Sequence, residues 1–201
     1  MPRRVSSGWP AVAEAPLAVV VGASAGGVHA LGTLLAGMSP SICCPLIVVC
    51  HTGSEDVEML RDVLALKSAL PVQEAQERHM PRPGIAHLAP AGYHLLMEVD
   101  GCFALSVDDR VCYSRPAIDV LFESAAAVHH ARLIAVVLTG ANHDGAAGLK
   151  AIRRAGGLAI VQSPADAIAA AMPEAAIRIA GADHILPLAG IAPLLNSLCL
   201  P

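Results

Sequence analysis

The chain has 201 residues, which is enough for one α/β domain with a sizeable core. Hydrophobic residues make up 55% of the sequence but aromatic residues only 2%, so the core has to be built from alanine, valine, leucine and isoleucine. The formal net charge of -4 gives no basic surface of the kind that binds nucleic acid. No apolar run approaches the roughly 20 residues of a membrane-spanning helix, so we expect no membrane insertion.

The first segment, residues 1–16, is rich in proline, serine and alanine. We expect it to form a flexible arm before a single domain over residues 17–201. Its arginines and the apolar residues behind them prompt comparison with a secretory signal peptide. Prolines and a glutamate interrupt that apolar region, so the sequence favours a cytoplasmic protein.

A buried parallel strand is predicted over residues 17–21, because this segment is entirely apolar and contains three valines. The glycines that follow permit a tight turn into a helix, predicted over residues 27–38. Ser24 therefore lies at the tip of a strand-to-helix corner. It stands in the pattern Gly-x-Ser-x-Gly, which is typical of a nucleophile elbow.

The next predicted strand, residues 46–50, ends in His51, and a second helix is predicted from Ser54 as its N-cap. The middle of the chain contains four short candidate strands that are separated by turn signals. We expect them to form a small antiparallel hairpin element at one edge of the sheet. They cover residues 71–74, 84–88, 94–98 and 102–106.

The second half of the chain alternates helices and strands. A helix through residue 130 is expected to open at residues 114–116, with Pro116 in its first turn. An apolar strand over residues 133–138 then leads to a second glycine-punctuated corner, which contains Asp144. The remaining predicted elements are a helix over 146–155, a strand over 158–162, a helix over 174–180, a strand over 184–186 and a helix over 191–198. Together they predict an α/β fold with a doubly wound, mostly parallel sheet and helices on both faces.

Three side chains that suit acyl transfer follow three of the predicted strands. They are Ser24, His51 and Asp144. Sites in open α/β sheets form at the carboxyl ends of the strands, so we expect the three to share one edge. The histidine would take the proton of the serine hydroxyl, and the carboxylate would fix the imidazole tautomer and stabilise the imidazolium. Backbone N–H groups at the two glycine corners are candidates for an oxyanion hole.

Other interpretations of these residues stay open. The corner at Ser24 also suits a phosphate, although a dinucleotide fingerprint needs glycine there and an acid in place of His51. In structural terms, Ser24 is a candidate cap of the first helix, and His51 a cap of the second helix or a partner of Asp56. Asp144 is a candidate N-cap of the helix after it. On that basis Asp144→Asn is expected to cost little stability, because asparagine caps about as well as aspartate.

The cysteines and histidines do not indicate a metal centre. The six cysteines lack C-x-x-C spacing, and the nine histidines lack H-E-x-x-H and H-x-H pairs. We therefore expect buried free thiols, no metal and no organic cofactor.

Six segments of the chain, in order, resemble the catalytic domain of the chemotaxis protein-glutamate methylesterases (CheB). They are VVVGASAGG from residue 19, PLIVVCH from 45, PGIAHLAPAGYH from 83, SRPAIDVLF from 114, LTGANHDGA from 138 and the stretch 162–173. The resemblance implies a serine esterase that hydrolyses glutamate methyl esters on the cytoplasmic helices of chemoreceptors and releases methanol. Deamidation of glutamine is a second activity of the family. Ser24 would be the nucleophile, His51 the base and Asp144 the orienting acid, with backbone oxyanion donors at Ala25 and Ala141.

The chain also departs from the family pattern. Family members usually carry an N-terminal receiver domain, and residues 1–16 do not provide one, so a separate regulatory chain is expected. Ala141 and Asn142 stand where the family has Met-Gly. Two further hypotheses stay open: a non-catalytic binding module of a signalling complex, and a serine hydrolase with another ester substrate.

Overall fold

The computed structural model describes residues 17–51 and 57–200, so the predicted arm over residues 1–16 and the predicted helix cap at Ser54 lie outside the described residues. The first half of the chain alternates two long strands with two helices and then gives four short strands. These elements are β1 (Ala18–Ala23), α1 (Gly27–Ala36), β2 (Leu46–Cys50), α2 (Val57–Ala65), β3 (Val72–Glu74), β4 (Ala86–Leu88), β5 (His94–Met97) and β6 (Phe103–Ser106). The second half contains α3 (Ile118–His129), β7 (Leu133–Val137), α4 (Ala146–Arg154), β8 (Leu158–Gln162), α5 (Ala171–Ala180), β9 (His184–Leu186) and α6 (Leu188–Cys199).

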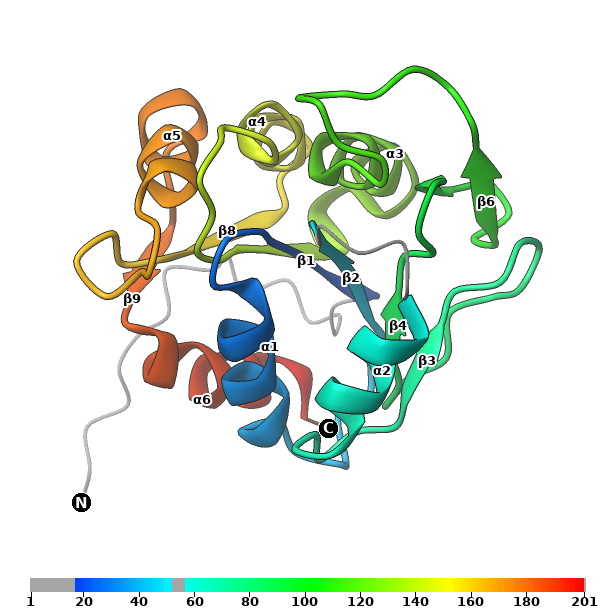
Figure 1. Cartoon of the computed structure of the whole chain (residues 1–201), viewed down its shortest axis with the longest axis horizontal. Coiled ribbons are helices and arrows are strands. Elements are labelled where there is room, and N and C mark those ends of the chain that lie inside the picture. Colours follow the sequence, from blue (N-terminus) through cyan, green and yellow to red (C-terminus); the bar gives the residue numbers. More distant parts are fainter. Residues whose placement is uncertain (1–16, 52–56, 201) are drawn as a thin grey trace.

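Seven strands form the central sheet in the order β3-β4-β2-β1-β7-β8-β9, and all neighbouring strands are parallel. The helices α1, α2 and α6 cover one face of this sheet, and α3, α4 and α5 cover the other (Figure 1). The chain winds outward from β1 in both directions, so β1 and β7 stand at the point where the winding direction changes. The predicted doubly wound α/β fold is therefore confirmed.

Burial on both faces explains why the central strands are uninterrupted apolar runs. All six residues of β1 are buried. Val19 and Val21 belong to the core beneath α1 and α6, whereas Ala18 and Val20 belong to the core beneath α3 and α4. A parallel strand between two helical layers has no solvent-facing side, so alternation with polar residues is lost.

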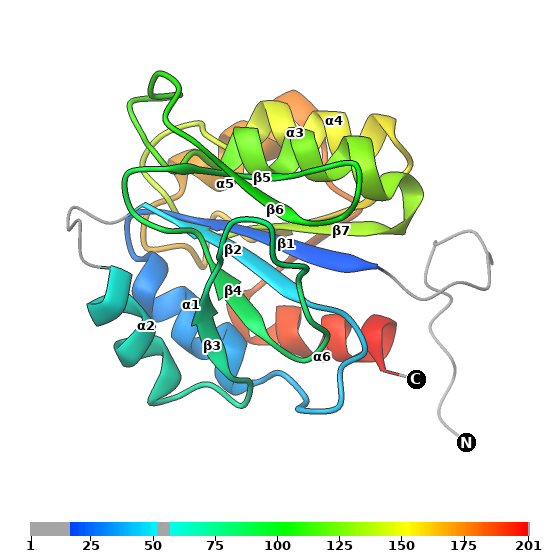
Figure 2. The ribbon, with the colours of Figure 1, turned by 90° about the vertical axis from the view of Figure 1, so that its right-hand side faces the viewer.

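The four short strands of the middle of the chain do not form one hairpin element. The strands β3 and β4 extend the parallel sheet beyond β2, so the assignment of residues 71–74 and 84–88 to the hairpin was wrong. A three-residue strand is too short for its sequence to show which strand it pairs with. The pairing of β4 with β2 is what places both strands in the parallel sheet. Only β5 and β6 pair antiparallel, and they lie on the side of the sheet that α3 covers (Figures 1 and 2).

Three helices begin at positions other than those predicted, and one of them is α6, which begins at Leu188 rather than at residue 191. The helix α3 begins at Ile118 rather than at residues 114–116, and Ala117 before it is extended. The helix α5 begins at Ala171, three residues before the predicted start. Its Pro173 is tolerated because a proline in the first turn removes no intrahelical hydrogen bond.

Two glycines offer a matched test of this packing. A Cβ atom on Gly22 of β1 would lie 2.5 Å from Cγ2 of Ile118, whereas one on Gly32 of α1 would meet only the Cδ of Lys67 at 3.9 Å. We expect Gly22→Ala to lower the free energy of unfolding by about 1–3 kcal/mol through overpacking. Gly32→Ala should raise it by about 0.5–1 kcal/mol, because alanine favours the helix interior. Urea unfolding measures both, and shifts of the two midpoints in the same direction would contradict this account.

Candidate active site

The ends of β1 and β2 bring Ser24 and His51 to the same edge of the sheet. Ala23 pairs with Cys50 in the last register position of these strands. The N–H of His51 then donates to the carbonyl of Ala23 at 2.9 Å. The first residue after each strand is therefore held beside the other by the ladder itself, as the sequence predicted from the strand order.

The corner that carries Ser24 is tied to the end of β7. The N–H of Ser24 donates to the carbonyl of Thr139 at 2.9 Å, and the hydroxyl of Thr139 donates to the carbonyl of Ala25 at 2.8 Å. Ser24 accepts the N–H of Gly27 with its backbone carbonyl, while Gly26 is the N-cap of α1 and no side chain caps that helix. The serine side chain is thus not used as the helix cap.

His51 and Asp144 are in direct contact. The Nε2 of His51 lies 2.9 Å from Oδ2 of Asp144, in a pair whose side chains are 11% and 0% exposed. This is a close contact between the imidazole and the carboxylate rather than an aligned hydrogen bond, and it is an ion pair only when His51 is protonated. The other ring nitrogen, Nδ1, is buried and has no hydrogen-bond partner within the described part of the chain. One ring nitrogen therefore faces the acid, and the other makes no hydrogen bond in the described part of the chain.

The Asp144 carboxylate accepts three backbone N–H groups in addition to the contact with His51. Its Oδ2 accepts from Ile118 at 2.7 Å, and its Oδ1 accepts from Asp119 and from Gly145 at 2.9 Å each. Burial alone would raise the pKa of Asp144. The contact with His51 and the N–H donors of Asp119 and Ile118 outweigh burial, so the pKa lies below its ordinary value. The carboxylate is held ionised.

Asp144 and Asp119 cap each other's helices. Asp144 binds the first N–H groups of α3, and this explains why α3 begins at Ile118. In return, Oδ1 of Asp119 accepts the N–H of Gly148 in the first turn of α4 at 2.7 Å. The alternative in which Asp144 is simply the N-cap of the following helix is wrong, because the N-cap of α4 is Gly145.

Asp119 is a residue that the sequence reasoning missed. It lies within the fourth of the family-like segments, and no local pattern marks it, since its partner is 29 positions away. Burial raises the pKa of the Asp119 carboxyl to about 6. The charges of Asp144 and Glu123 act in the same direction, whereas the N–H of Gly148 acts against them. Asp119 therefore adds a second titratable carboxyl beside Asp144.

Two backbone N–H groups are open at the corners around Ser24. Among the described residues, the N–H groups of Ala25 and Ala141 donate to no partner, and both residues are exposed. Their neighbours are fixed, because Gly140 exchanges backbone hydrogen bonds with Ala169 and Met172 at 3.0 and 2.9 Å. Fixed, unpartnered donors of this kind suit the stabilisation of an oxyanion.

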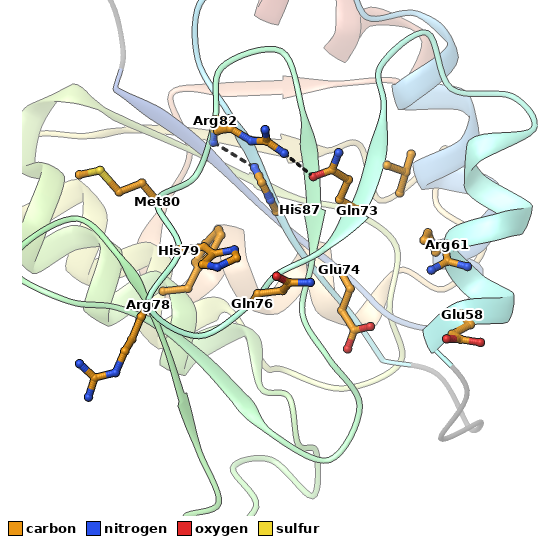
Figure 3. A pocket seen from close by; sticks show the side chains of 12 residues that line it. Glu58, Arg61, Gln73, Glu74, Gln76, Arg78, His79, Met80, Arg82 and His87 are labelled. Atoms are coloured by element: carbon orange, nitrogen blue, oxygen red, sulfur yellow. Dashed lines mark hydrogen bonds between the residues drawn. The ribbon is translucent and has the colours of Figure 1, made fainter.

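An open cavity of about 1080 Å³ lies at the β3 edge of the sheet, and none of the three strand-end side chains lines it. Figure 3 shows Arg61 of α2, and Arg78 and Arg82 of the segment between β3 and β4, around it together with Glu58 and Glu74. Its buried His87 accepts the N–H of Arg82 at 3.0 Å, and burial lowers the pKa of His87 to about 4, so this imidazole stays neutral. The cavity is lined by charges of both signs, and its histidine is occupied by a hydrogen bond to the backbone. The ends of β1 and β2 are therefore the better candidate for a catalytic site.

Comparison with known proteins agrees with this geometry. The family model described as CheB methylesterase matches residues 19–195. The chain belongs to the CheB methylesterase family. The crystal structure of the Thermotoga maritima CheB methylesterase catalytic domain superposes with a TM-score of 0.87 at 30% identity, over 92% of this chain and 99% of that one. The family resemblance and the expectation of a protein-glutamate methylesterase type of enzyme are thus confirmed at the level of the family.

Curated relatives differ in how much of their length the chain matches. A Leptospira interrogans protein is 44% identical over 178 residues, which are 88% of this chain and 92% of that protein. The protein-glutamate methylesterase/protein-glutamine glutaminase 2 of Pseudomonas syringae is 39% identical over 177 residues, and the chain spans only 53% of its length. Within the described residues of this CheB-family chain, no helix is long and apolar enough to cross a membrane.

The hydrogen bonds of Asp144 change the expected effect of replacing it. An asparagine has one acceptor oxygen where the aspartate uses two, so its NH₂ group would face a buried N–H donor. The N-cap interpretation from which a small cost of Asp144→Asn was expected is wrong, because Gly145 is the N-cap of α4. We now expect the free energy of unfolding to fall by about 1–3 kcal/mol in urea titrations. The control Asp62→Asn alters an exposed ion pair and should have almost no effect. An unchanged midpoint for Asp144→Asn would contradict the capping role.

The raised pKa of Asp119 predicts a pH-dependent stability. Its folded value of about 6 lies above the unfolded value of about 3.9. The folded state therefore keeps a proton that the unfolded state has lost, and the free energy of unfolding falls as pH rises through this window. Asp119→Asn keeps an acceptor for Gly148 and removes this contribution. Its stability relative to the unmodified chain should increase between about pH 4 and pH 6 and then level off, as measured by urea unfolding across that range. A difference in the free energy of unfolding between Asp119→Asn and the unmodified chain that does not change with pH would contradict the prediction.

Proposed function

We propose that the chain is a serine esterase that hydrolyses glutamate methyl esters on chemoreceptors through Ser24, His51 and Asp144. The observation that carries the proposal is the close contact between His51 and the buried, ionised Asp144, at a strand end next to that of Ser24. A histidine oriented by a carboxylate beside a serine is the arrangement that activates a hydroxyl for acyl transfer.

The first step transfers the glutamyl group to the enzyme. The Oγ of Ser24 attacks the ester carbonyl while His51 takes the hydroxyl proton, and since Nε2 faces Asp144, the accepting atom is Nδ1. Asp144 stabilises the imidazolium. The tetrahedral intermediate places its oxyanion on the N–H groups of Ala25 and Ala141. When it collapses, the ester C–O bond breaks and His51 returns the proton to the leaving methoxide, which departs as methanol.

The second step regenerates the enzyme. His51 takes a proton from water, whose oxygen attacks the acyl carbonyl, and the glutamate carboxylate leaves as Ser24 regains its proton. Deamidation of glutamine follows the same course with ammonia as the leaving group. The same residues therefore support both reactions that the names of the relatives state.

The substrate class rests on family membership and on the composition of the site. CheB-family relatives named protein-glutamate methylesterase occur in Pseudomonas syringae and Geobacillus kaustophilus. The serine is only partly buried and its neighbour Ala25 is exposed, so a side chain projecting from a receptor helix can reach it. A cytoplasmic location follows from a substrate on cytoplasmic helices. Regulation by a separate chain is part of the same proposal.

Removal of the nucleophile tests the assignment. Ser24→Ala should abolish covalent labelling by a serine-reactive phosphonate and lower methanol release from methylated receptor by several orders of magnitude, since triad members act as a unit. The control Ser41→Ala removes an exposed serine near the end of α1 and should label normally. Unchanged labelling of Ser24→Ala would show that Ser24 is not the nucleophile. Labelling at Ser24 without methanol release would favour a serine hydrolase with another ester substrate, and a folded chain that neither labels nor hydrolyses would favour a binding module.

A further inference from the structure

The family-like stretch 162–173 takes no part in the proposed mechanism, yet it is bonded to both corners of the site. The N–H of Ala169 donates to the hydroxyl of Thr139 at 2.8 Å, and the carbonyl of Ala169 accepts the N–H of Gly140 at 3.0 Å. The hydroxyl of Thr139 in turn donates to the carbonyl of Ala25 at 2.8 Å. Ala169 therefore lies beside both corners that carry a proposed oxyanion donor.

A buried glutamine holds the segment between β8 and α5 in place. Gln162 is buried, and its Oε1 accepts the N–H of Thr139 at 2.9 Å. Its Nε2 donates to the carbonyl of Asp166 at 3.3 Å and to the carboxylate of the same residue at 3.1 Å. That carboxylate also accepts the N–H of Leu188 at 2.6 Å. The segment is thus joined to the end of β7 and to the start of α6, so the fold sets the position of the side chains that it presents.

Ile168 belongs to this segment and lies against the corner that carries Ser24. A Cβ atom on Gly26, the N-cap of α1, would lie 2.8 Å from the Cβ of Ile168, so the isoleucine packs directly on the backbone of Gly26. Gly26 is two residues after Ser24 and follows Ala25. In spite of this contact, 67% of Ile168 is exposed. A large aliphatic side chain is therefore held in solvent next to the proposed nucleophile and oxyanion donor.

The place of Ile168, rather than its exposure alone, indicates a role. One exposed apolar side chain is common on a protein surface. Ile168, however, lies where a substrate must pass, because an ester whose carbonyl contacts the N–H of Ala25 brings its adjoining surface over Gly26. Pockets for small molecules enclose most of their ligand between buried walls. The high exposure of Ile168 therefore suits contact with the surface of a protein substrate.

We propose that Ile168 is a specificity-determining residue, which contacts an apolar side chain beside the esterified glutamate on a receptor helix. This role rests on the proposed function and names how the site distinguishes a protein substrate from a small ester. Residues three and four positions from the glutamate lie on the same face of a helix, so one of them reaches Ile168 while the glutamate reaches Ser24. The contact is the same in the ground state and the transition state, so it lowers KM and leaves kcat almost unchanged.

The test uses the purified full chain and measures methanol release from methylated receptor, together with the rate of labelling by a small serine-reactive phosphonate. Ile168→Ala should raise KM for the receptor about tenfold, with kcat within about twofold and the labelling rate unchanged. Ile168→Leu should keep KM close to that of the unmodified chain, because leucine preserves the apolar volume. The control Ile179→Ala removes an exposed isoleucine from the last turn of α5, about 12 Å along the helix from its start beside Gly140, and should change neither quantity.

Two results would overturn the role of Ile168 alone. One is normal hydrolysis of the receptor by Ile168→Ala with an unchanged KM. The other is a fall in both kcat and the labelling rate of Ile168→Ala, because the isoleucine would then act only by packing on Gly26 and fixing the corner of Ser24. A different result would show that the proposed substrate is wrong, and this inference with it: an unmodified chain that is labelled at Ser24 but releases no methanol from the receptor.

Discussion

The structure depends on the contacts of one buried group, the Asp144 carboxylate. It accepts the opening N–H groups of α3, accepts the N–H of Gly145 at the start of α4, and contacts His51 at the end of β2. Three elements that are distant in sequence are thus joined by one buried charge. A buried carboxylate is tolerated only when its lone pairs are satisfied, and here the fold supplies donors for both oxygens.

The same arrangement explains how the fold places the proposed catalytic residues. The ladder between β1 and β2 sets the separation of Ser24 and His51, and Thr139 ties the serine corner to the end of β7. Backbone hydrogen bonds position Ser24 and His51, and the side chains of Thr139 and Asp144 add to them. Preorganisation of this kind keeps reacting groups in place without a cost at the moment of reaction.

The sequence predicted those features that depend on local pattern. The central strands are buried on both sides, so the apolar runs at β1, β2 and β7 marked them clearly, and parallel order brought Ser24, His51 and Asp144 to one edge. The start of α3 could not be predicted, because its cap is Asp144, 26 residues along the chain from Ile118. The partners of β3 and β4 were missed for a similar reason, since three residues contain too little periodicity to show which sheet they join.

The double use of Asp144 has a consequence for how this CheB-family domain can change during evolution. A lineage that no longer needed hydrolysis would still need the carboxylate, since without it α3 loses the acceptor of its first N–H groups. Ser24, whose side chain caps no helix, is under no such structural constraint. Under the proposed mechanism, inactive descendants of such a domain would therefore keep the aspartate and lose the serine, and the serine would distinguish active members from inactive ones.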